Sequence, residues 1–171
     1  MLTATAANKT LWIASSAWQS IEVFAQAHYP FETGGMLIGY QPDDGSVVVT
    51  DVIGPGPNAK HTRMSFRPHH AYQQQRLDEL FHNSNGKKTY LGDWHTHPNG
   101  FNALSRKDMR VLRRIAETPE AQTQSPVMLV LVTSKESEGN RVCCVQYQSY
   151  RRKRLFLSHY NLANLTIRQF D

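Results

Sequence analysis

The stretch from Tyr90 to Asp108 constrains this chain most, because it sets two histidines and a carboxylate at a spacing that a strand, a loop and a helix can bring together. Residues 90–97 (YLGDWHTH) have the pattern of a strand, in which His95 and His97 project from the same face. A proline follows and ends the strand, and Asp108 comes near the start of the next predicted helix. Two imidazoles and one carboxylate leave the fourth position of a tetrahedral site open for water, which is typical of a catalytic zinc.

Each part of this pattern also has a purely structural interpretation. A His-x-His pair by itself is weak evidence for a metal, because such pairs are common. Ser105 and Asp108 have the spacing of a capping box at the start of a helix. The two interpretations of Asp108 are compatible, since a capping box can also hold the carboxylate in place for a metal. It is the combination of the histidine pair with the capping box that indicates a metal site.

The rest of the chain alternates short apolar runs with amphipathic stretches, which indicates both strands and helices. No repeat, low-complexity tract or long linker divides it, so residues 1–171 are expected to form a single domain. These elements predict an α/β fold with a mixed β-sheet flanked by helices. Strands are expected at Thr10–Ala14, Gly35–Tyr40, Val47–Ile53, Met64–Phe66, Tyr90–His97, Val127–Thr133, Arg141–Tyr147 and Leu155–Tyr160, and helices at about Ser15–His28, His69–His82 and Ser105–Thr118.

Each predicted helix carries an apolar stripe that should face the sheet. Ser15 or Ser16 is expected to cap the first helix. The expected buried faces are Trp18, Ile21, Phe24 and Ala25 in the first helix, Tyr72, Leu77, Leu80 and Phe81 in the second, and Met109, Leu112, Ile115 and Ala116 in the third.

Composition excludes several classes of protein. Hydrophobic residues make up 40% of the chain, as in ordinary soluble domains. No apolar run approaches the roughly 18 residues needed to span a bilayer, and the N-terminus lacks the pattern of a secretory signal. The adjacent Cys143 and Cys144 would form a strained bridge, so reduced thiols are expected. We therefore expect a cytoplasmic protein without a membrane partner.

The formal net charge of +5 is unevenly distributed. One cluster recurs at helical spacing, which is typical of a solvated helix face. A second cluster is a continuous basic run near the C-terminus. Either cluster could attract an acidic protein surface or a nucleic acid, although a nucleic acid is not the expected partner. The first cluster is Arg106, Lys107, Arg110, Arg113 and Arg114, and the second is Arg151–Arg154.

An upstream glutamate completes a resemblance to a known family. Glu32 opens the segment Glu-x-x-Gly-x-Leu-x-Gly, and about sixty residues later His95-x-His97 is followed by seven residues and Ser105-x-x-Asp108. This series resembles the signature of the JAMM/MPN+ (JAB-type) zinc metalloproteases, and it covers roughly residues 10 to 148. The sequence around the histidines is most similar to small bacterial members that accompany ubiquitin-like conjugation, including those of CBASS-type antiviral operons.

The resemblance implies a cytidine-deaminase-like JAB/MPN fold and one Zn²⁺ per chain, bound by His95, His97 and Asp108. It implies that Glu32 takes a proton from the activated water and passes it to the leaving amine. It also implies that Ser105 donates a hydrogen bond to the oxyanion. The implied enzyme is an isopeptidase or peptidase that cuts after the C-terminal tail of a ubiquitin-like protein, from conjugates or from its precursor. Activating or conjugating enzymes of the same operon are implied partners.

Three expectations concern the surroundings of the site. The loop Asn99–Leu104 lacks the prolines that many relatives carry, which leaves the substrate preference open. Asp93 is expected on the same face as the ligands, where it could support the histidines, whereas Trp94 is expected in the core. The segment Asn58–Phe66 is the expected strand edge for a substrate tail.

Rival classes fit less well. Nucleic-acid deaminases need His-x-Glu and Pro-Cys-x-x-Cys, which are absent. Amidohydrolases with His-x-His use a barrel of about 250 residues, and non-haem iron oxygenases usually order their ligands differently. Two alternatives stay open: a non-catalytic MPN binding or scaffold protein, and a DNA-repair-associated protein, because residues 97–100 (HPNG) match a pattern found in relatives linked to DNA repair.

Overall fold

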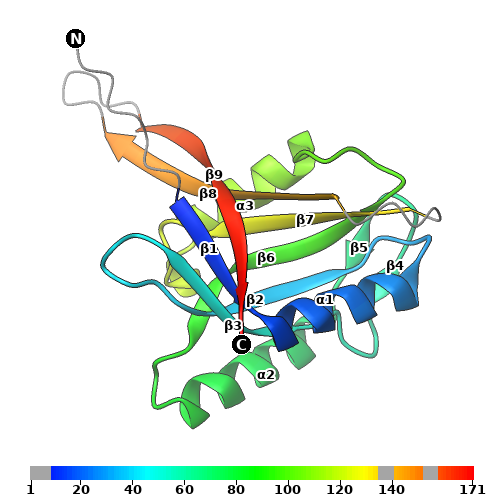
Figure 1. Ribbon diagram of the computed structural model, residues 1–171, viewed down its shortest axis with the longest axis horizontal. Coiled ribbons are helices and arrows are strands. Elements are labelled where there is room, and N and C mark those ends of the chain that lie inside the picture. The colour runs from blue at the N-terminus through cyan, green and yellow to red at the C-terminus, as the bar shows by residue number, and fades with distance from the viewer. Residues whose placement is uncertain (1–8, 135–140, 152–157) are drawn as a thin grey trace.

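The computed structural model describes residues 9–134, 141–151 and 158–171. Seven strands form one sheet in the order β1-β3-β2-β6-β7-β8-β9, and β9 pairs with β1, so the sheet closes into a barrel (Figure 1). A separate two-stranded ribbon is made by β4 and β5. The strands are β1 (Lys9–Ala14), β2 (Gly34–Tyr40), β3 (Val47–Ile53), β4 (Lys60–His61), β5 (Phe66–Arg67), β6 (Thr89–Pro98), β7 (Val127–Thr133), β8 (Arg141–Arg151) and β9 (Ser158–Phe170).

Three α-helices and one 3₁₀ turn accompany these strands in the described part of the chain: α1 (Ser15–His28), α2 (His70–Asn83), α3 (Arg106–Glu117) and η1 (Pro119–Ala121). The prediction of a mixed sheet flanked by helices is confirmed, because β1-β3, β1-β9 and β6-β7 are parallel pairs and the other neighbours are antiparallel. None of the described helices has the length and apolarity that crossing a bilayer requires.

The closure of the sheet was not predicted. The last strand was expected to end near Tyr160, but β9 continues to Phe170 and pairs in parallel with the whole of β1, from Lys9 opposite Leu165 to Ala14 opposite Phe170. The continuation was missed because its stability comes from pairing with a strand at the other end of the chain rather than from a local apolar run. Residues 155–157 of the predicted segment lie outside the described residues.

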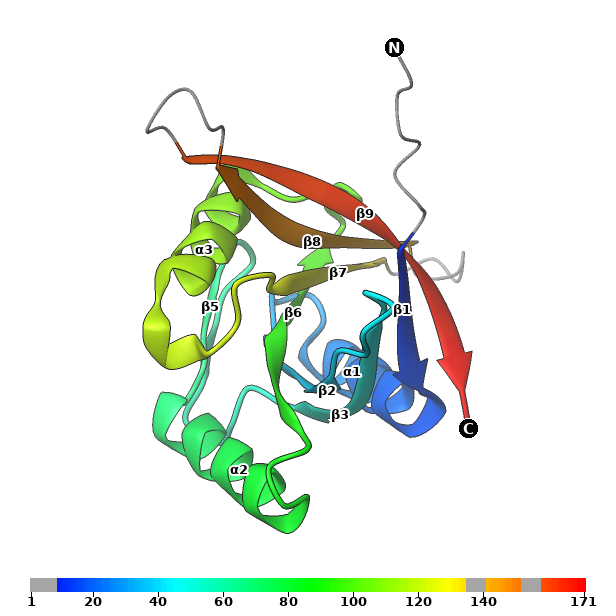
Figure 2. The same ribbon diagram turned by 90° about the vertical axis from the view of Figure 1, so that its left-hand side faces the viewer.

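The curved sheet has an inner face that encloses α1 and an outer face that carries α2 and α3 (Figure 2). Strand β7 is buried on both faces, which explains its unbroken apolar sequence. Leu129 and Leu131 point inward to the core around Ile21 of α1. Met128 and Val130 point outward to a second, smaller core. The two faces therefore have separate hydrophobic cores.

The start of α1 differs from the prediction. Ala14 is the N-cap residue, and no side chain caps the helix. The hydroxyl group of Ser15 instead lies 3.1 Å from the carbonyl oxygen of Phe170 and 2.9 Å from the carboxylate of Asp171. The prediction that Ser15 or Ser16 caps this helix is therefore wrong. The hydroxyl group of Ser15 donates its hydrogen bond to the end of β9 instead.

Two further predictions need correction on the outer side of the molecule. The strand predicted at Met64–Phe66 is the ribbon β4–β5, in which Met64 lies in the connecting turn and is 85% exposed. In α2 the fully buried residue is Gln73, whose side chain donates to the carbonyl oxygen of Gly54, while Phe81 of the expected buried face is 41% exposed. A polar contact to the backbone therefore anchors this helix.

Cys143 and Cys144 are both free, as expected. Cys144 packs in the inner core and Cys143 against the outer one, in agreement with strand alternation. Burial raises the pKa of both thiols. They are inert packing residues in this fold.

We expect Leu112→Ala to destabilise the protein by about 2–5 kcal/mol, because Leu112 is the one fully buried residue of α3 and its truncation leaves a cavity in the outer core. Urea denaturation measures the change in the free energy of unfolding. Val23→Ala is the matched control, since Val23 is 58% exposed on α1 and should change stability by less than about 0.5 kcal/mol. Equal losses in both variants would contradict this account of the outer core.

Candidate metal centre

Strand β6 brings the two histidines to the outer face of the sheet. It lies between β2, with which it is antiparallel, and β7, with which it is parallel. Trp94 is fully buried in the inner core, as predicted, and its Nε1 lies 3.4 Å from the carbonyl oxygen of Ile53. Because neighbouring side chains alternate, His95 and His97 both point outward at the end of the strand.

The start of α3 brings a carboxylate to the same place. The capping box is present: the Asp108 amide donates to Ser105 Oγ over 3.2 Å, and Asp108 Oδ2 accepts from the Ser105 amide at 2.7 Å. These two hydrogen bonds fix the orientation of the Asp108 carboxylate. Both of its oxygens lie near the imidazoles, with Oδ1 3.4 Å from His95 Nε2 and Oδ2 3.4 Å from His97 Nε2.

The separation of these atoms fits a metal ion. The Nε2 atoms of His95 and His97 are 3.0 Å apart. Ligands bound tetrahedrally at about 2.0–2.1 Å lie about 3.3–3.4 Å from one another, close to the spacing found here. Among the described residues, His95, His97 and Asp108 are the one group of three or more His, Cys, Asp or Glu side chains whose ligand atoms could share an ion, all within 4.8 Å. Nitrogen and oxygen donors of this kind suit zinc and other divalent transition metals.

Charge is strongly coupled within this group. Burial acts to raise the pKa of Asp108, but hydrogen bonds to His95 and His97 outweigh burial and lower the pKa well below its usual range. The hydrogen bond to Asp108 raises the pKa of His97 above its ordinary value of 6.5, against the effect of burial. Asp108 is therefore an anion throughout the physiological range, and its charge favours the protonated form of His97.

Glu32 faces the same cleft from the loop between α1 and β2, two residues before β2 begins. Its backbone is held by the ribbon: its amide donates to the carbonyl oxygen of Thr62 at 2.8 Å, and its own carbonyl oxygen lies 2.9 Å from His61 Nδ1. Burial raises the pKa of its carboxyl group, although His95 and His97 reduce the shift. A carboxylate of this kind is suited to taking up a proton.

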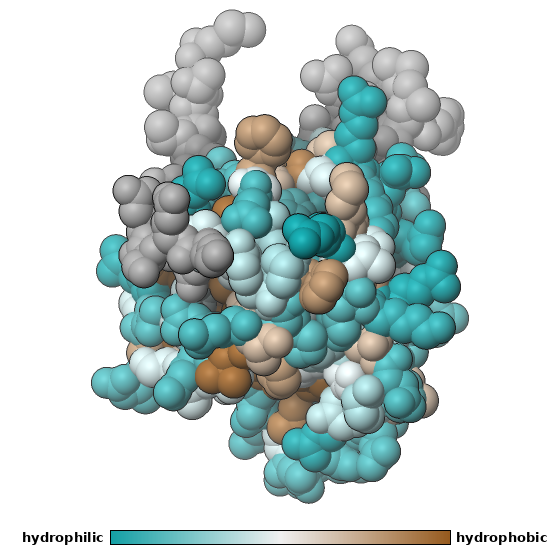
Figure 3. Space-filling view, turned by 90° about the vertical axis from the view of Figure 1, so that its right-hand side faces the viewer, coloured by the Kyte–Doolittle hydropathy of each residue, from teal (hydrophilic) through white to brown (hydrophobic). Residues whose placement is uncertain are grey.

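A cleft of about 870 Å³ contains Glu32, Ser105 and the three possible ligands. Its mouth carries the two most exposed large apolar side chains of the described residues, Met64 of the ribbon turn and Phe101, which are 85% and 87% exposed. Figure 3 views the side of the molecule on which β6 ends, and hydrophobic residues are scattered there among hydrophilic ones. The structure thus brings all five predicted site residues to one opening.

Asp93 lines the cleft on the same face as the ligands, but its side chain accepts a hydrogen bond from the Tyr90 hydroxyl group at 2.8 Å rather than from a histidine. Tyr90 reaches this face because the pairing of β2 with β6 shifts register beside Gly92. Gly92 has φ +145°, and a Cβ there would lie 1.9 Å from the carbonyl oxygen of Val127. Only glycine fits this bulge.

Sequence reasoning missed the residues that hold the loops of the site together. His61 binds the backbone of Glu32, and its ring lies 4.2 Å from that of His28. The Tyr29 hydroxyl group lies 3.1–3.2 Å from the side-chain amide of Asn99, which joins the Glu32 loop to the loop after His97. These contacts connect segments far apart in the chain, so no local pattern indicates them.

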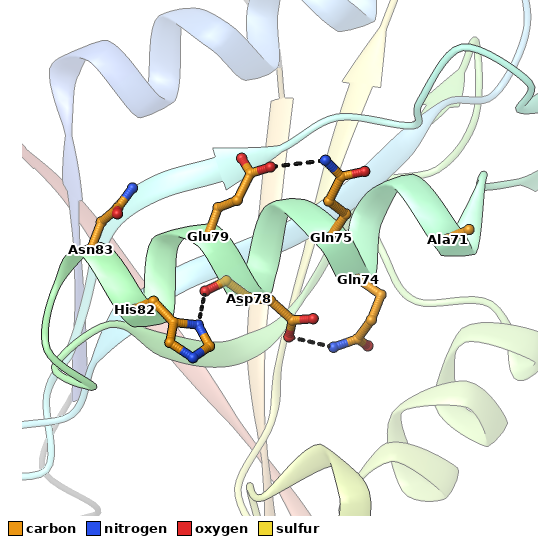
Figure 4. Close-up of a pocket in the computed structure, with 7 residues that line it drawn as sticks. All are labelled: Ala71, Gln74, Gln75, Asp78, Glu79, His82 and Asn83. Carbon is orange, nitrogen blue, oxygen red and sulfur yellow. Dashed lines mark hydrogen bonds between the residues drawn. The ribbon is translucent and has the colours of Figure 1, made fainter.

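A second hollow, on the outer surface of α2, has no such chemistry (Figure 4). Its side chains all come from one helix and bind one another. Gln74 donates to Asp78 at 2.9 Å and Gln75 to Glu79 at 3.0 Å, while His82 Nδ1 lies 2.7 Å from the carbonyl oxygen of Asp78. The cleft at the end of β6 is therefore the better candidate for an active site.

Comparison with known proteins agrees with this geometry. Residues 14–146 match the family of prokaryotic homologues of the JAB domain, a range that includes all five site residues. The chain belongs to the JAB family. The resemblance to the JAMM/MPN+ metalloproteases is thereby confirmed, and this JAB-family chain is a JAMM-type hydrolase.

Curated relatives of the JAB-family chain include a probable metalloprotease, y4qB, from Sinorhizobium fredii, which is 38% identical over 75% of this chain and 79% of its own length. A CD-NTase/cGAS isopeptidase from Escherichia coli is 36% identical over 52% of this chain and 57% of its own length. The isopeptidase of the same name from Vibrio cholerae is 31% identical over 64% of this chain and 65% of its own. The chain thus spans between half and two thirds of these two isopeptidases.

Among solved structures, the protein DSY2949 from Desulfitobacterium hafniense is similar with a TM-score of 0.61, covering 95% of this chain and 94% of that one. Sequence identity is 15%, so the likeness concerns the fold alone. The two proteins share this fold over nearly their full lengths.

We expect purified protein to bind about one zinc ion per chain, and His97→Ala or Asp108→Ala to lose it, because either change removes a ligand from the site. Glu32→Ala should keep the metal, because Glu32 lies outside the ligand group. Elemental analysis after dialysis measures the content. Zinc retained by Asp108→Ala at the level of the parent would rule out this ligand set.

Metal affinity should fall with decreasing pH. His97 must lose its proton before it can bind a metal, and its pKa is raised, so protons begin to compete above pH 6.5. The anionic Asp108 contributes no such dependence in this range, since its pKa is lowered. Competition titrations with a chromophoric chelator at several pH values measure the affinity. An affinity independent of pH between about 6 and 8 would contradict this coupling.

Proposed function

We propose that this chain is a zinc-dependent isopeptidase or peptidase that hydrolyses the bond after the C-terminal tail of a ubiquitin-like protein. It would release that protein from conjugates or mature its precursor. The observation that carries the proposal is the meeting of His95, His97 and Asp108 with Glu32 and Ser105 in one cleft. A free position among the possible ligands suits a catalytic rather than a structural metal.

His95, His97 and Asp108 would hold the metal through Nε2 and carboxylate oxygens. When bound, a zinc ion lowers the pKa of water from about 15.7 toward roughly 7 and polarises a carbonyl group. The three side chains fit this task, because two neutral imidazoles and one carboxylate leave the ion a net positive charge. A metal with only one anionic ligand remains a strong Lewis acid.

Glu32 acts as the general base in this proposal. Its carboxylate takes a proton from the attacking water as the new C–O bond forms, and it then gives that proton to the leaving nitrogen as the C–N bond breaks. Partial burial, which raises the pKa of Glu32, makes the carboxylate a better proton acceptor than one in water. The hydrogen bonds from the ribbon to its backbone keep this group at the cleft.

Ser105 stabilises the oxyanion. Its Oγ accepts from the Asp108 amide, so the hydroxyl hydrogen is free to donate into the cleft. The same contact holds the hydroxyl group at the start of α3, where the positive end of the helix dipole also favours a developing negative charge. Ser105 thus combines a structural and a chemical role.

The substrate class is supported by the names of the relatives, since the two from Escherichia coli and Vibrio cholerae are CD-NTase/cGAS isopeptidases. An extended tail needs a strand edge, and within the described residues the barrel is closed while β4–β5 keeps open edges. Phe66 of the ribbon packs over Gly34 beside His95: a Cβ on Gly34 would lie 2.5 Å from the Phe66 ring. This contact holds the ribbon against β2 beside the ligand group, so a chain that pairs with the ribbon would pass close to His95.

We expect Glu32→Gln to lower kcat by about 10²–10⁴-fold while zinc content stays at the level of the parent, because the variant removes the base but no ligand. Substrates are a linear fusion of a ubiquitin-like protein to a reporter, the same protein linked to a lysine, and a CD-NTase linked through its C-terminus. Failure of the metal-loaded parent to cut any of them, or equal rates for parent and variant, would refute the proposal.

Ser105→Ala should lower kcat by about 10²–10³-fold through loss of the oxyanion donor. It should also cost about 1 kcal/mol of stability, because the cap is lost. Ser105→Thr keeps the hydroxyl group and serves as the control. A Ser105→Ala variant that is destabilised but fully active would leave Ser105 with its structural role alone.

A further inference from the structure

Five cationic side chains lie along one side of α3, and all five are exposed: Arg106, Lys107, Arg110, Arg113 and Arg114. At 3.6 residues per turn they fall within a stripe about 120° wide. The opposite side of the helix carries the buried Leu112. These five residues form one continuous surface, here named the basic face of α3.

This arrangement is unfavourable for the helix itself. Arg106 and Lys107 lie in the first turn, where the helix dipole disfavours positive charge. Like charges also stand four residues apart, from Arg106 to Arg110 and from Arg110 to Arg114. Among the described residues, Arg113 alone in this group has an acidic partner, Glu117 at 2.8 Å. The basic face is therefore not neutralised by the part of the chain that the structure describes.

The neighbouring helix α2 shows the opposite pattern. Its acidic side chains bind partners on the same helix: Asp78 accepts from Gln74, and Glu79 accepts from Gln75 (Figure 4). Glu79 also pairs with Arg76. A solvated helix surface in this protein can thus satisfy its own charges, and the basic face of α3 does not.

The basic face begins at the cleft. Lys107 lines the cleft and lies close enough to lower the pKa of Glu32, against the larger effect of burial. Arg114, two turns further on, lines a separate hollow between α2 and α3. The helix of 12 residues is about 18 Å long, so the positive surface extends from the candidate active site across one side of the molecule.

We propose that the basic face of α3 binds an acidic surface on the body of the protein whose C-terminal tail occupies the cleft, an inference that rests on the function proposed above. A tail held at the metal centre brings the attached domain against the adjoining helix. Opposite charge there would steer the approach and orient the domain. A protein suits this face better than a single-stranded nucleic acid, because α3 contains no aromatic residue on which bases could stack.

The first test measures binding without cleavage. Fluorescence anisotropy of three labelled probes is measured as the metal-loaded protein is added. The probes are a glutamate-rich peptide, a neutral peptide of equal length, and a DNA duplex. Arg106→Glu/Arg110→Glu should weaken binding of the acidic peptide by at least about tenfold at low salt. Glutamate at position 106 is favourable in the first turn of α3, and glutamate at position 110 would stand four residues before Arg114, so this variant should keep α3 folded.

Lys87→Glu/Arg168→Glu is the matched control, with the same change in net charge on residues outside α3. Binding of the acidic peptide by the parent and the control, but not by the α3 variant, supports the proposal. Equal binding by all three proteins, or no binding by the parent, overturns it. Tighter binding of the duplex than of the acidic peptide, lost in the α3 variant, overturns it in favour of a nucleic acid.

The second test uses the substrate that the parent cleaves. The α3 variant should raise KM by roughly tenfold and leave kcat within about twofold, with the difference vanishing at high salt. Unchanged KM in the α3 variant would refute this role even if cleavage itself is established. A parent that cleaves nothing refutes the proposed function, and the binding test still decides whether α3 prefers an acidic protein surface.

Discussion

The structure of the site depends on the capping box that joins Ser105 to Asp108. Burial of a carboxylate is costly unless hydrogen bonds or a positive charge compensate it. The Ser105 amide supplies one hydrogen bond at 2.7 Å, and the two histidines, 3.4 Å away, supply the rest. The three side chains are only 8–14% exposed, so water contributes little. A bound cation is the natural compensation for this arrangement, which couples metal binding to the packing of α3.

Because side chains alternate along β6, one face of this strand packs in the inner core and the other face carries the candidate metal ligands. Trp94 points into the inner core, where apolar side chains from α1 and the strands provide most of the buried surface. His95 and His97 point to the outer face, where the ribbon β4–β5 and the start of α3 border the cleft. A shift of one residue in the pairing of β6 would exchange these two sets. The bulge at Gly92 lies upstream of the histidines, so the register that matters for the site is set by the pairs His95–Gly34 and His95–Val130.

Local patterns sufficed to predict most of the elements and the group of His95, His97 and Asp108. Glu32 and the chemical role of Ser105 were predicted from the resemblance to the JAMM/MPN+ family. The spacing of His95, His97 and Asp108 reflects backbone geometry that a strand and a capped helix impose wherever they occur. Contacts between distant segments were not predictable, among them the pairing of β9 with β1 and the hydrogen bond of His61 to Glu32. The prediction of the cap of α1 was wrong for the same reason, because the hydroxyl group of Ser15 contacts Phe170 near the other end of the chain. The burial of Gln73 was not predicted, because it depends on a hydrogen bond to the carbonyl oxygen of Gly54, which is distant in the sequence.

Because the main sheet is closed into a barrel, an extended ligand is expected to pair with another element. Within the described residues every strand of that sheet has a neighbouring strand on each side, whereas both strands of the ribbon β4–β5 keep an outer edge free for an extended ligand. The ribbon also holds the backbone of Glu32 through Thr62 and His61. A chain that binds along the ribbon would therefore contact the element that positions Glu32. Because the ribbon has only two residues in each strand, its own pairing is weak, and a bound strand would stabilise both the ribbon and the loop of Glu32. Under the function proposed above, binding of a substrate tail at the ribbon would also order the loop that carries Glu32.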